Sequence, residues 1–114
     1  MAQPVKEKLT LKDGSIYEGE TKDGKPHGRG KATDRIGIIY KGDFVDGEEH
    51  GKGKITYPSG KVYEGDFLGT NYHGKGKLIE ENGDVYEGDF VDGWFHGIGK
   101  LTYKYGKVYE GGFK

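Results

Sequence analysis

Short runs of alternating apolar and polar residues recur along the whole chain. In the run VYEGDF at 62–67, Tyr63 and Phe67 fall on one face with a glycine between them, whereas Glu64 and Asp66 fall on the other. Alternation with a period of two is typical of a β-strand that has one buried face. The chain contains no comparable helical pattern, so we predict an all-β protein.

The same run returns at a constant spacing. Its tyrosines are 23 residues apart, and the four histidines of the chain keep the same spacing. Self-similarity at a fixed period is the signature of a stacked repeat array. We therefore predict a flexible tail at 1–7 and an array at 8–114. The array comprises a half-repeat at 8–16, full repeats at 17–39, 40–62, 63–85 and 86–108, and a terminal strand at 109–114.

One type of connection between the runs has the composition of a short hairpin loop. In Pro58-Ser59-Gly60 the glycine is third, as in a three-residue loop whose last residue is left-handed. This loop predicts that Thr56 lies opposite Val62 and that Ile55 lies opposite Tyr63. The expected fold is an elongated, twisted, single antiparallel meander sheet of stacked β-hairpins with about ten strands, in which each hairpin contacts only its neighbours.

The longer connection, which contains the VDG and HG elements, predicts a second register. It places Phe67 opposite Gly76 and Asp66 opposite Lys77. The same register predicts one acid–lysine pair per repeat, namely Glu20–Lys31, Asp43–Lys54, Asp66–Lys77 and Asp89–Lys100. Opposite charges that face each other across two strands are favourable. We therefore expect a charge-balanced, solvated polar face rather than an anion site at these lysines and the adjacent Arg29, Lys52 and Lys75.

The apolar face is predicted to carry most of the packing energy, because a single-layer sheet has little else to bury. Gly65, between two aromatic residues, is expected to leave a gap that Leu78 and a neighbouring ring fill. The aromatic face comprises Tyr40, Phe44, Tyr63, Phe67, Tyr86, Phe90, Tyr109 and Phe113.

Composition agrees with a thin structure. Only 32% of the residues are hydrophobic, and 23 of the 114 are glycine, so a thick core is not expected. The chain has no cysteine, no apolar run of membrane-spanning length and no signal peptide at its N-terminus, which favours a cytoplasmic location. A formal charge of −1 provides no global attraction to nucleic acid or to acidic membranes.

The repeated segment YKGDFVDGEEHGKGKITYPSGKV at 40–62 closely resembles the MORN repeat, whose consensus has tyrosine, glycine, tryptophan and HG elements at these positions. The consensus tryptophan is phenylalanine in repeats 2 to 4 and Thr21 in repeat 1. The resemblance covers 8–114 and implies an elongated sheet of hairpins. It also implies a scaffold or adaptor that binds partner proteins in an aromatic groove, self-associates or contacts phosphoinositide membranes, in cytoskeletal, ciliary or junctional assemblies.

Candidate chemistry is sparse. Successive histidines are expected about 10 Å apart, two strands at about 4.8 Å each, whereas ligands of one zinc ion lie about 2.0–2.1 Å from the metal. The glycine-rich segments lack the third glycine of a dinucleotide-binding motif and open no helix. We therefore expect no metal, no cofactor, no nucleic-acid partner and no enzymatic activity.

Repeat 4 departs from the others in the second connection. Trp94, Phe95 and Ile98 replace polar or charged residues, and Tyr72 is the matching aromatic of repeat 3. Aromatic residues are enriched at the cores of protein interfaces, so these four residues are the candidate contact surface. An unpaired last strand at 108–113 adds a route to a homodimer by strand addition. We therefore predict a non-enzymatic adaptor that binds a protein partner or itself, with binding to anionic phospholipids as the alternative.

Overall fold

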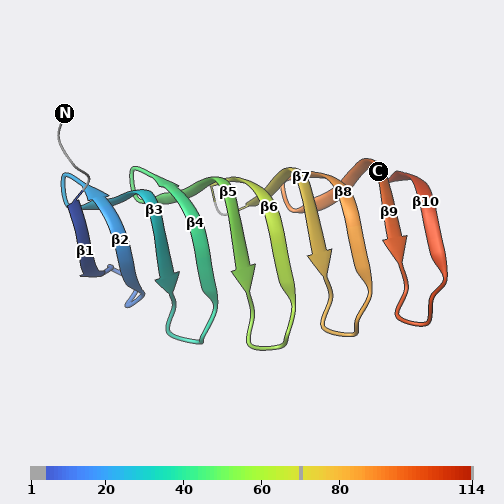
Figure 1. Cartoon of the computed structure of the whole chain (residues 1–114), viewed down its shortest axis with the longest axis horizontal. Helices are drawn as coiled ribbons and strands as arrows, with labels where there is room; N and C mark the ends of the chain where they lie inside the picture. Colours follow the sequence, from blue (N-terminus) through green and yellow to red (C-terminus); the bar gives the residue numbers. More distant parts are fainter. Residues whose placement is uncertain (1–4, 70, 114) are drawn as a thin grey trace.

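The computed structural model describes residues 5–69 and 71–113, which form one sheet of ten antiparallel strands in sequence order, with no helix in those ranges (Figure 1). This architecture confirms the predicted fold class. The strands are β1 Val5–Thr10, β2 Ile16–Lys22, β3 Lys25–Thr33, β4 Ile39–Val45, β5 Glu48–Thr56, β6 Val62–Leu68, β7 Asn71–Ile79, β8 Val85–Val91, β9 Trp94–Thr102 and β10 Val108–Phe113.

The array is elongated because each strand pairs only with the strands next to it in the sequence. Its principal extents are 49 × 29 × 20 Å and its radius of gyration is 15.7 Å, compared with about 13 Å for a compact domain of roughly 100 residues. Figure 1 shows the strands side by side along the long axis, with the three-residue loops along one edge and the opposite strand ends curling over.

The first strand begins earlier than predicted. Val5, Lys6 and Glu7 pair with β2, so the flexible tail expected over 1–7 is wrong for 5–7. These residues extend the pairing of β1 with β2 even though they lie outside the recognisable repeat. The remainder of the expected tail, 1–4, lies outside the described residues.

The three-residue loops have the predicted geometry. The Tyr57 amide donates to the Lys61 carbonyl at 2.9 Å, and the Gly60 amide donates to the Tyr57 carbonyl at 3.0 Å. Gly60 has a φ of 97°, which a residue with a side chain rarely adopts. The loop therefore fixes Ile55 opposite Tyr63, as expected.

The other connections are two-residue turns. Asp46 and Gly47 have φ angles of 49° and 90°, the positive pair of a type I′ turn, which favours an Asp-Gly sequence. In repeat 3, Leu68 and Asn71 are likewise register partners.

The tight turn changes the register that we predicted for the second strand pair. Gly65 lies opposite Gly76, and Phe67 lies opposite Tyr72 rather than Gly76. A β-bulge between Gly65 and Phe67 accounts for the difference, because it absorbs extra residues on β7. The carboxylate of Asp66 accepts a hydrogen bond from the Lys75 amide at 3.1 Å beside this bulge.

One glycine per strand, from β2 to β10, lies on a single line across the sheet, which we call the glycine line. Adjacent members are register partners at every strand junction. Every junction therefore has the same alignment at this point. The glycine line comprises Gly19, Gly30, Gly42, Gly53, Gly65, Gly76, Gly88, Gly99 and Gly111.

Candidate functional site

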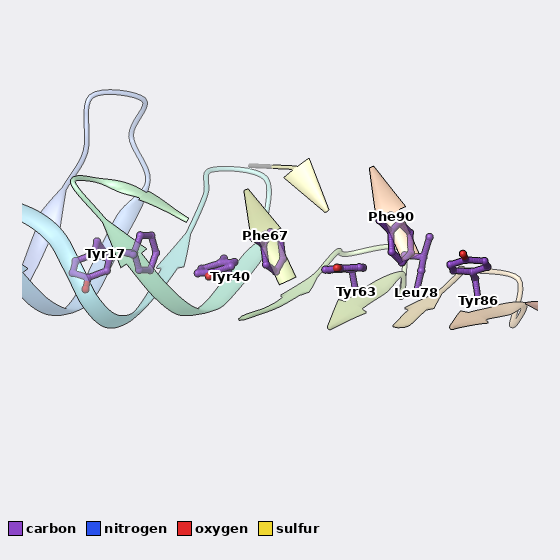
Figure 2. Close-up of a cluster of buried hydrophobic side chains, with 8 residues drawn as sticks. Tyr17, Tyr40, Tyr63, Phe67, Leu78, Tyr86 and Phe90 are labelled. Atoms are coloured by element: carbon purple, nitrogen blue, oxygen red, sulfur yellow. The ribbon is translucent and has the colours of Figure 1, made fainter. Parts of the chain in front are cut away.

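The aromatic side chains form a ladder along one face of the sheet. In this ladder Phe44, Phe67, Phe90 and Phe113 each lie edge-on between two tyrosines. The Phe67 ring centroid is 5.0 Å from that of Tyr40 and 5.1 Å from that of Tyr63, with interplanar angles of 86° and 89°. Figure 2 shows Phe67 and Phe90 upright between the tyrosines. Such T-shaped pairs are the favoured geometry of aromatic rings.

Most of the predicted aromatic face is buried core. Tyr40, Phe44, Tyr63, Phe67, Tyr86 and Phe90 are buried. Phe113 is half-buried, and Tyr109 is 45% exposed on the last described strand. The rings therefore hold the repeats together, and a partner can reach only what lies over or beside them.

The hydroxyl of each tyrosine in the ladder donates a hydrogen bond to a carbonyl of its own strand. The Tyr63 hydroxyl donates to the Asp66 carbonyl at 2.7 Å, and the equivalent bond is present in the other repeats. Burial raises the pKa of Tyr63 above its ordinary value. The ring crosses Gly76, where an added Cβ would collide with it, so this position requires glycine.

The predicted role of Gly65 needs a correction. Leu78 lies opposite Tyr63 and does not fill the space beside Gly65. A Cβ on Gly65 would lie 2.9 Å from the Tyr63 hydroxyl and 2.5 Å from the Gly76 Cα. The tyrosine two residues earlier therefore occupies the gap, because the ring lies along its own strand.

A second layer of rings covers the ladder in repeats 3 and 4. Tyr72 stacks on Tyr63 at 4.0 Å with an interplanar angle of 8°, and Phe95 stacks on Tyr86 at 3.9 Å and 9°. The Tyr72 hydroxyl also lies 2.7 Å from that of Tyr57. The strand bend brings these residues over the tyrosines, and the sequence pattern alone did not predict the stacking.

Repeat 2 lacks this second layer. Glu49 occupies the position of Tyr72, and Asp34 occupies that of Tyr57, each 23 residues earlier. Burial raises the pKa of the Glu49 carboxyl, and the nearby Glu48 and Asp13 carboxylates add to the shift. Carboxylates thus replace both hydroxyl-bearing residues one repeat earlier.

Beside Glu49 the apolar face has a depression of about 300 Å³, which we call the repeat 2 depression. Sequence reasoning missed it, although Glu49 and Asp34 stand where the next repeat has Tyr72 and Tyr57. Its wall combines apolar and acidic groups, so it can accept an apolar anchor with a polar rim. The lining residues are Asp13, Ser15, Ala32, Asp34, Ile38, Tyr40, Glu49, Ile55, Tyr57 and Phe67.

The candidate contact residues of repeat 4 do not lie on one face. Phe95 pairs with Phe90 in register and packs on the aromatic ladder, whereas its neighbour Trp94 pairs with Val91 on the opposite face. Trp94 and Ile98 are 76% and 71% exposed. Alternation along the strand separates Trp94 from Phe95, so the cluster seen in the sequence is divided between a packed ring and two exposed side chains.

The polar face is crossed by ion pairs that connect neighbouring hairpins. Arg29 lies 3.3 Å from Asp43, Lys75 lies 2.6 Å from Asp89, and Lys52 pairs with Asp66. Partial burial tends to raise the pKa of the Asp66 carboxyl, but the Lys52 ammonium and the Lys75 amide outweigh it and hold that pKa below its ordinary value.

The charge ladder that we predicted from the sequence is wrong, because the register of the bulged pairs differs. The lysines of this column face Glu18, Lys41, Glu64 and Glu87 in the preceding strand. The predicted pairs that do not form as register partners are Glu20–Lys31, Asp43–Lys54, Asp66–Lys77 and Asp89–Lys100.

Within residues 5–69 and 71–113, no group of three or more His, Asp or Glu side chains is placed to hold a metal ion. His27 instead accepts a hydrogen bond from the Asp46 amide at 3.3 Å through Nδ1. No helix that is long and apolar enough to cross a membrane occurs in the described ranges.

A single sheet of stacked, near-identical hairpins held by aromatic rings defines a repeat protein. The MORN repeat model matches four consecutive segments, 17–37, 40–62, 63–85 and 86–106, which together make up most of the chain. The chain belongs to the MORN repeat family. Repeats of this family are non-enzymatic modules for interaction with proteins or membranes. A search of curated protein sequences found no significant match.

Proposed function

We propose that this chain is a non-enzymatic adaptor module that binds a polypeptide segment of a partner protein on its aromatic face. The repeat 2 depression is the observation that supports this proposal. It lies where the second ring layer of repeats 3 and 4 ends, and half-buried Ile55 and Tyr57 border it. A partner residue inserted there would bury apolar surface between rigid strands, as an interface anchor does.

Two isoleucines of one loop provide a matched test. Ile38 lines the depression, whereas Ile36 is 72% exposed and does not. A photo-crosslinking amino acid at Ile38 should capture a partner that the same group at Ile36 does not capture. The partner, once identified and purified, should bind Ile36→Ser like wild type and Ile38→Ser more weakly. Equal binding by the two variants would contradict the proposal.

Self-association through the polar side of repeat 4 is the second form of the same proposal. Trp94, Val91 and Ile98 are exposed large apolar residues there, and tryptophan is enriched in interface cores. Sedimentation equilibrium should give a smaller mass for Trp94→Ser/Ile98→Ser than for wild type, whereas Tyr105→Ser, a change on an exposed turn, should have no effect. A wild-type protein that is monomeric at all concentrations would exclude this form.

The alternative of anionic-phospholipid binding has weaker support, because acids alternate with lysines along most of the polar face. Flotation with phosphoinositide-containing vesicles tests it directly. Salt-sensitive flotation of the wild-type protein would favour a membrane role over the adaptor role, and we expect the protein to remain at the bottom of the gradient.

A further inference from the structure

Three lysines lie side by side on the polar face of the central strands. Lys31 of β3 pairs in register with Lys41 of β4, and Lys41 pairs with Lys54 of β5. Residues that face each other on adjacent antiparallel strands are about 4.5–5.5 Å apart, so the three side chains start within roughly 11 Å of one another. We call these residues the lysine row.

The lysine row is an exception within an alternating pattern. Across the same line of the sheet, acids alternate with lysines on both sides of it, and Lys41 stands where the other tyrosine-bearing strands have glutamate. Like charges directly opposite each other are unfavourable. The other members of the line are Lys8, Glu18, Glu64, Lys77, Glu87, Lys100 and Glu110.

The adjacent row shows that this sheet otherwise pairs its charges. Arg29, Lys52 and Lys75 each pair with an aspartate of the next hairpin. Asp43, two residues from Lys41 on the same strand, is already engaged by the Arg29 guanidinium at 3.3 Å and the Lys52 amide at 3.3 Å. Among the described residues, no member of the lysine row has a carboxylate within 4.0 Å.

The surface around Lys41 is concave. One depression of about 320 Å³ is lined by Lys41 and Lys54 together with Arg29 and Lys52, and another of about 220 Å³ by all three members of the lysine row. Glu64 lies at the border of the first. A narrow anionic group can therefore reach the lysines, whereas a broad anionic surface would also meet the acids on both sides.

We propose that the lysine row binds an acidic segment of a partner protein, with carboxylate side chains of the segment placed between Lys41 and its two neighbours. This site lies on the face opposite the repeat 2 depression, so it does not depend on the adaptor function proposed there. The bound carboxylates relieve the repulsion among the ammonium groups, and the shallow depressions admit side chains from an extended peptide.

The test uses a fluorescent, acetylated hexaglutamate peptide and the full chain, with binding followed by fluorescence anisotropy at low and at physiological salt. Lys41→Gln and Lys77→Gln form a matched pair, because each removes one charge from an exposed lysine of the same line and Lys77 lies between two glutamates. We expect the wild-type chain to bind the peptide with an affinity that falls as salt rises. Lys41→Gln should lower that affinity tenfold or more, and Lys77→Gln should lower it less than twofold.

A gain-of-function variant strengthens the test. Glu87→Lys places lysine between Lys77 and Lys100 and so recreates the same row in repeat 4. In the Lys41→Gln background, Glu87→Lys should restore peptide binding, and thermal unfolding should confirm that every variant is folded.

Three results would overturn the proposal. The first is that the wild-type chain does not bind the peptide, and the second is that the two glutamine variants lose equal affinity for it. The third is Lys41-dependent flotation with phosphatidylserine vesicles that excess hexaglutamate does not inhibit. The last result would assign the row to a membrane surface. If Lys41→Gln loses peptide binding but still binds the partner captured at Ile38, the lysine row and the adaptor site are separate sites.

Discussion

Repeats 1 and 2 share their backbone with repeats 3 and 4 but differ in how the aromatic ladder is covered. Phe90 contacts four rings, those of Tyr63, Tyr72, Tyr86 and Phe95. Among the described residues, Phe44 contacts only the rings of Tyr17 and Tyr40. The columns of tyrosine, phenylalanine and glycine thus determine the fold, whereas the covering residues determine how densely each repeat is packed.

The less densely covered half also carries both proposed binding surfaces. The repeat 2 depression lies on one face of β4 and β5, and the lysine row lies on the other. The depression adjoins Glu49, where repeats 3 and 4 have an aromatic residue, and the row contains Lys41, where the other tyrosine-bearing strands have glutamate. The repeat tolerates such departures because neither residue belongs to the ladder.

The largest expected effect comes from removing equivalent phenylalanines. Phe90→Ala should lower the free energy of unfolding by about 3–5 kcal/mol. Phe44→Ala should cost at least about 1 kcal/mol less, because each lost ring pair is worth about 0.5–1.5 kcal/mol. Urea denaturation of the two variants measures this difference, and equal losses would show that the second ring layer does not stabilise repeat 4.

Glu49→Tyr should make repeat 2 resemble repeat 3. The new ring is expected to stack on Tyr40 as Tyr72 stacks on Tyr63, raising the free energy of unfolding by about 0.5–1.5 kcal/mol. Glu48→Tyr changes the exposed neighbour in the same way and should have little effect. The same urea measurement checks both, and a gain in the control alone would refute the comparison.

Lys41→Glu should restore the alternation of charge along its line. Two repulsive pairs become attractive, and each cross-strand pair contributes about 0.2–1 kcal/mol, so the variant should be more stable by roughly 1 kcal/mol at low salt. The gain should shrink at high salt through screening. Lys77→Glu makes the same substitution at a lysine that lies between two glutamates, so it should lower the stability of the protein. Thermal melts at two ionic strengths would detect both the gain and the loss of stability.

The smallest effect depends on pH. Because the folded state raises the pKa of Glu49 above its ordinary value of 4.5, it binds the proton more tightly than the unfolded state, so stability is favoured at low pH and lost as the carboxyl ionises. Glu49→Gln should therefore have the same free energy of unfolding as wild type at a pH where the carboxyl is protonated in both states. It should become the more stable protein as pH rises towards 7. Urea titrations at several pH values should show this divergence between wild type and Glu49→Gln. The control variant Glu48→Gln should not diverge from wild type.

Much of the fold was predictable because local chemistry specifies it. Period-two alternation located the strands, and Pro58-Ser59-Gly60 determined the register of Ile55 against Tyr63. The register predicted across the two-residue turns was wrong, although Asp46-Gly47 is a favoured type I′ sequence. A β-bulge shifts the alignment, and counting alternate residues cannot reveal a bulge.

The candidate site was less predictable than the fold for the same reason. Trp94 and Phe95 were assigned to a connection, whereas the two-residue turn makes them the first residues of β9. Alternation along that strand places their side chains on opposite faces. The stacking of Tyr72 on Tyr63 depends on the bend that the bulge introduces. Three lysines that meet across β3, β4 and β5 could be recognised only once the register was known.

The glycine line gives the molecule a uniform unit of length. Because every strand junction has the same alignment there, a whole repeat can be removed or duplicated while the flanking strands still meet in register. Each repeat adds two strands, or about 10 Å. Removal or duplication of whole repeats would therefore change the length of the array in equal steps.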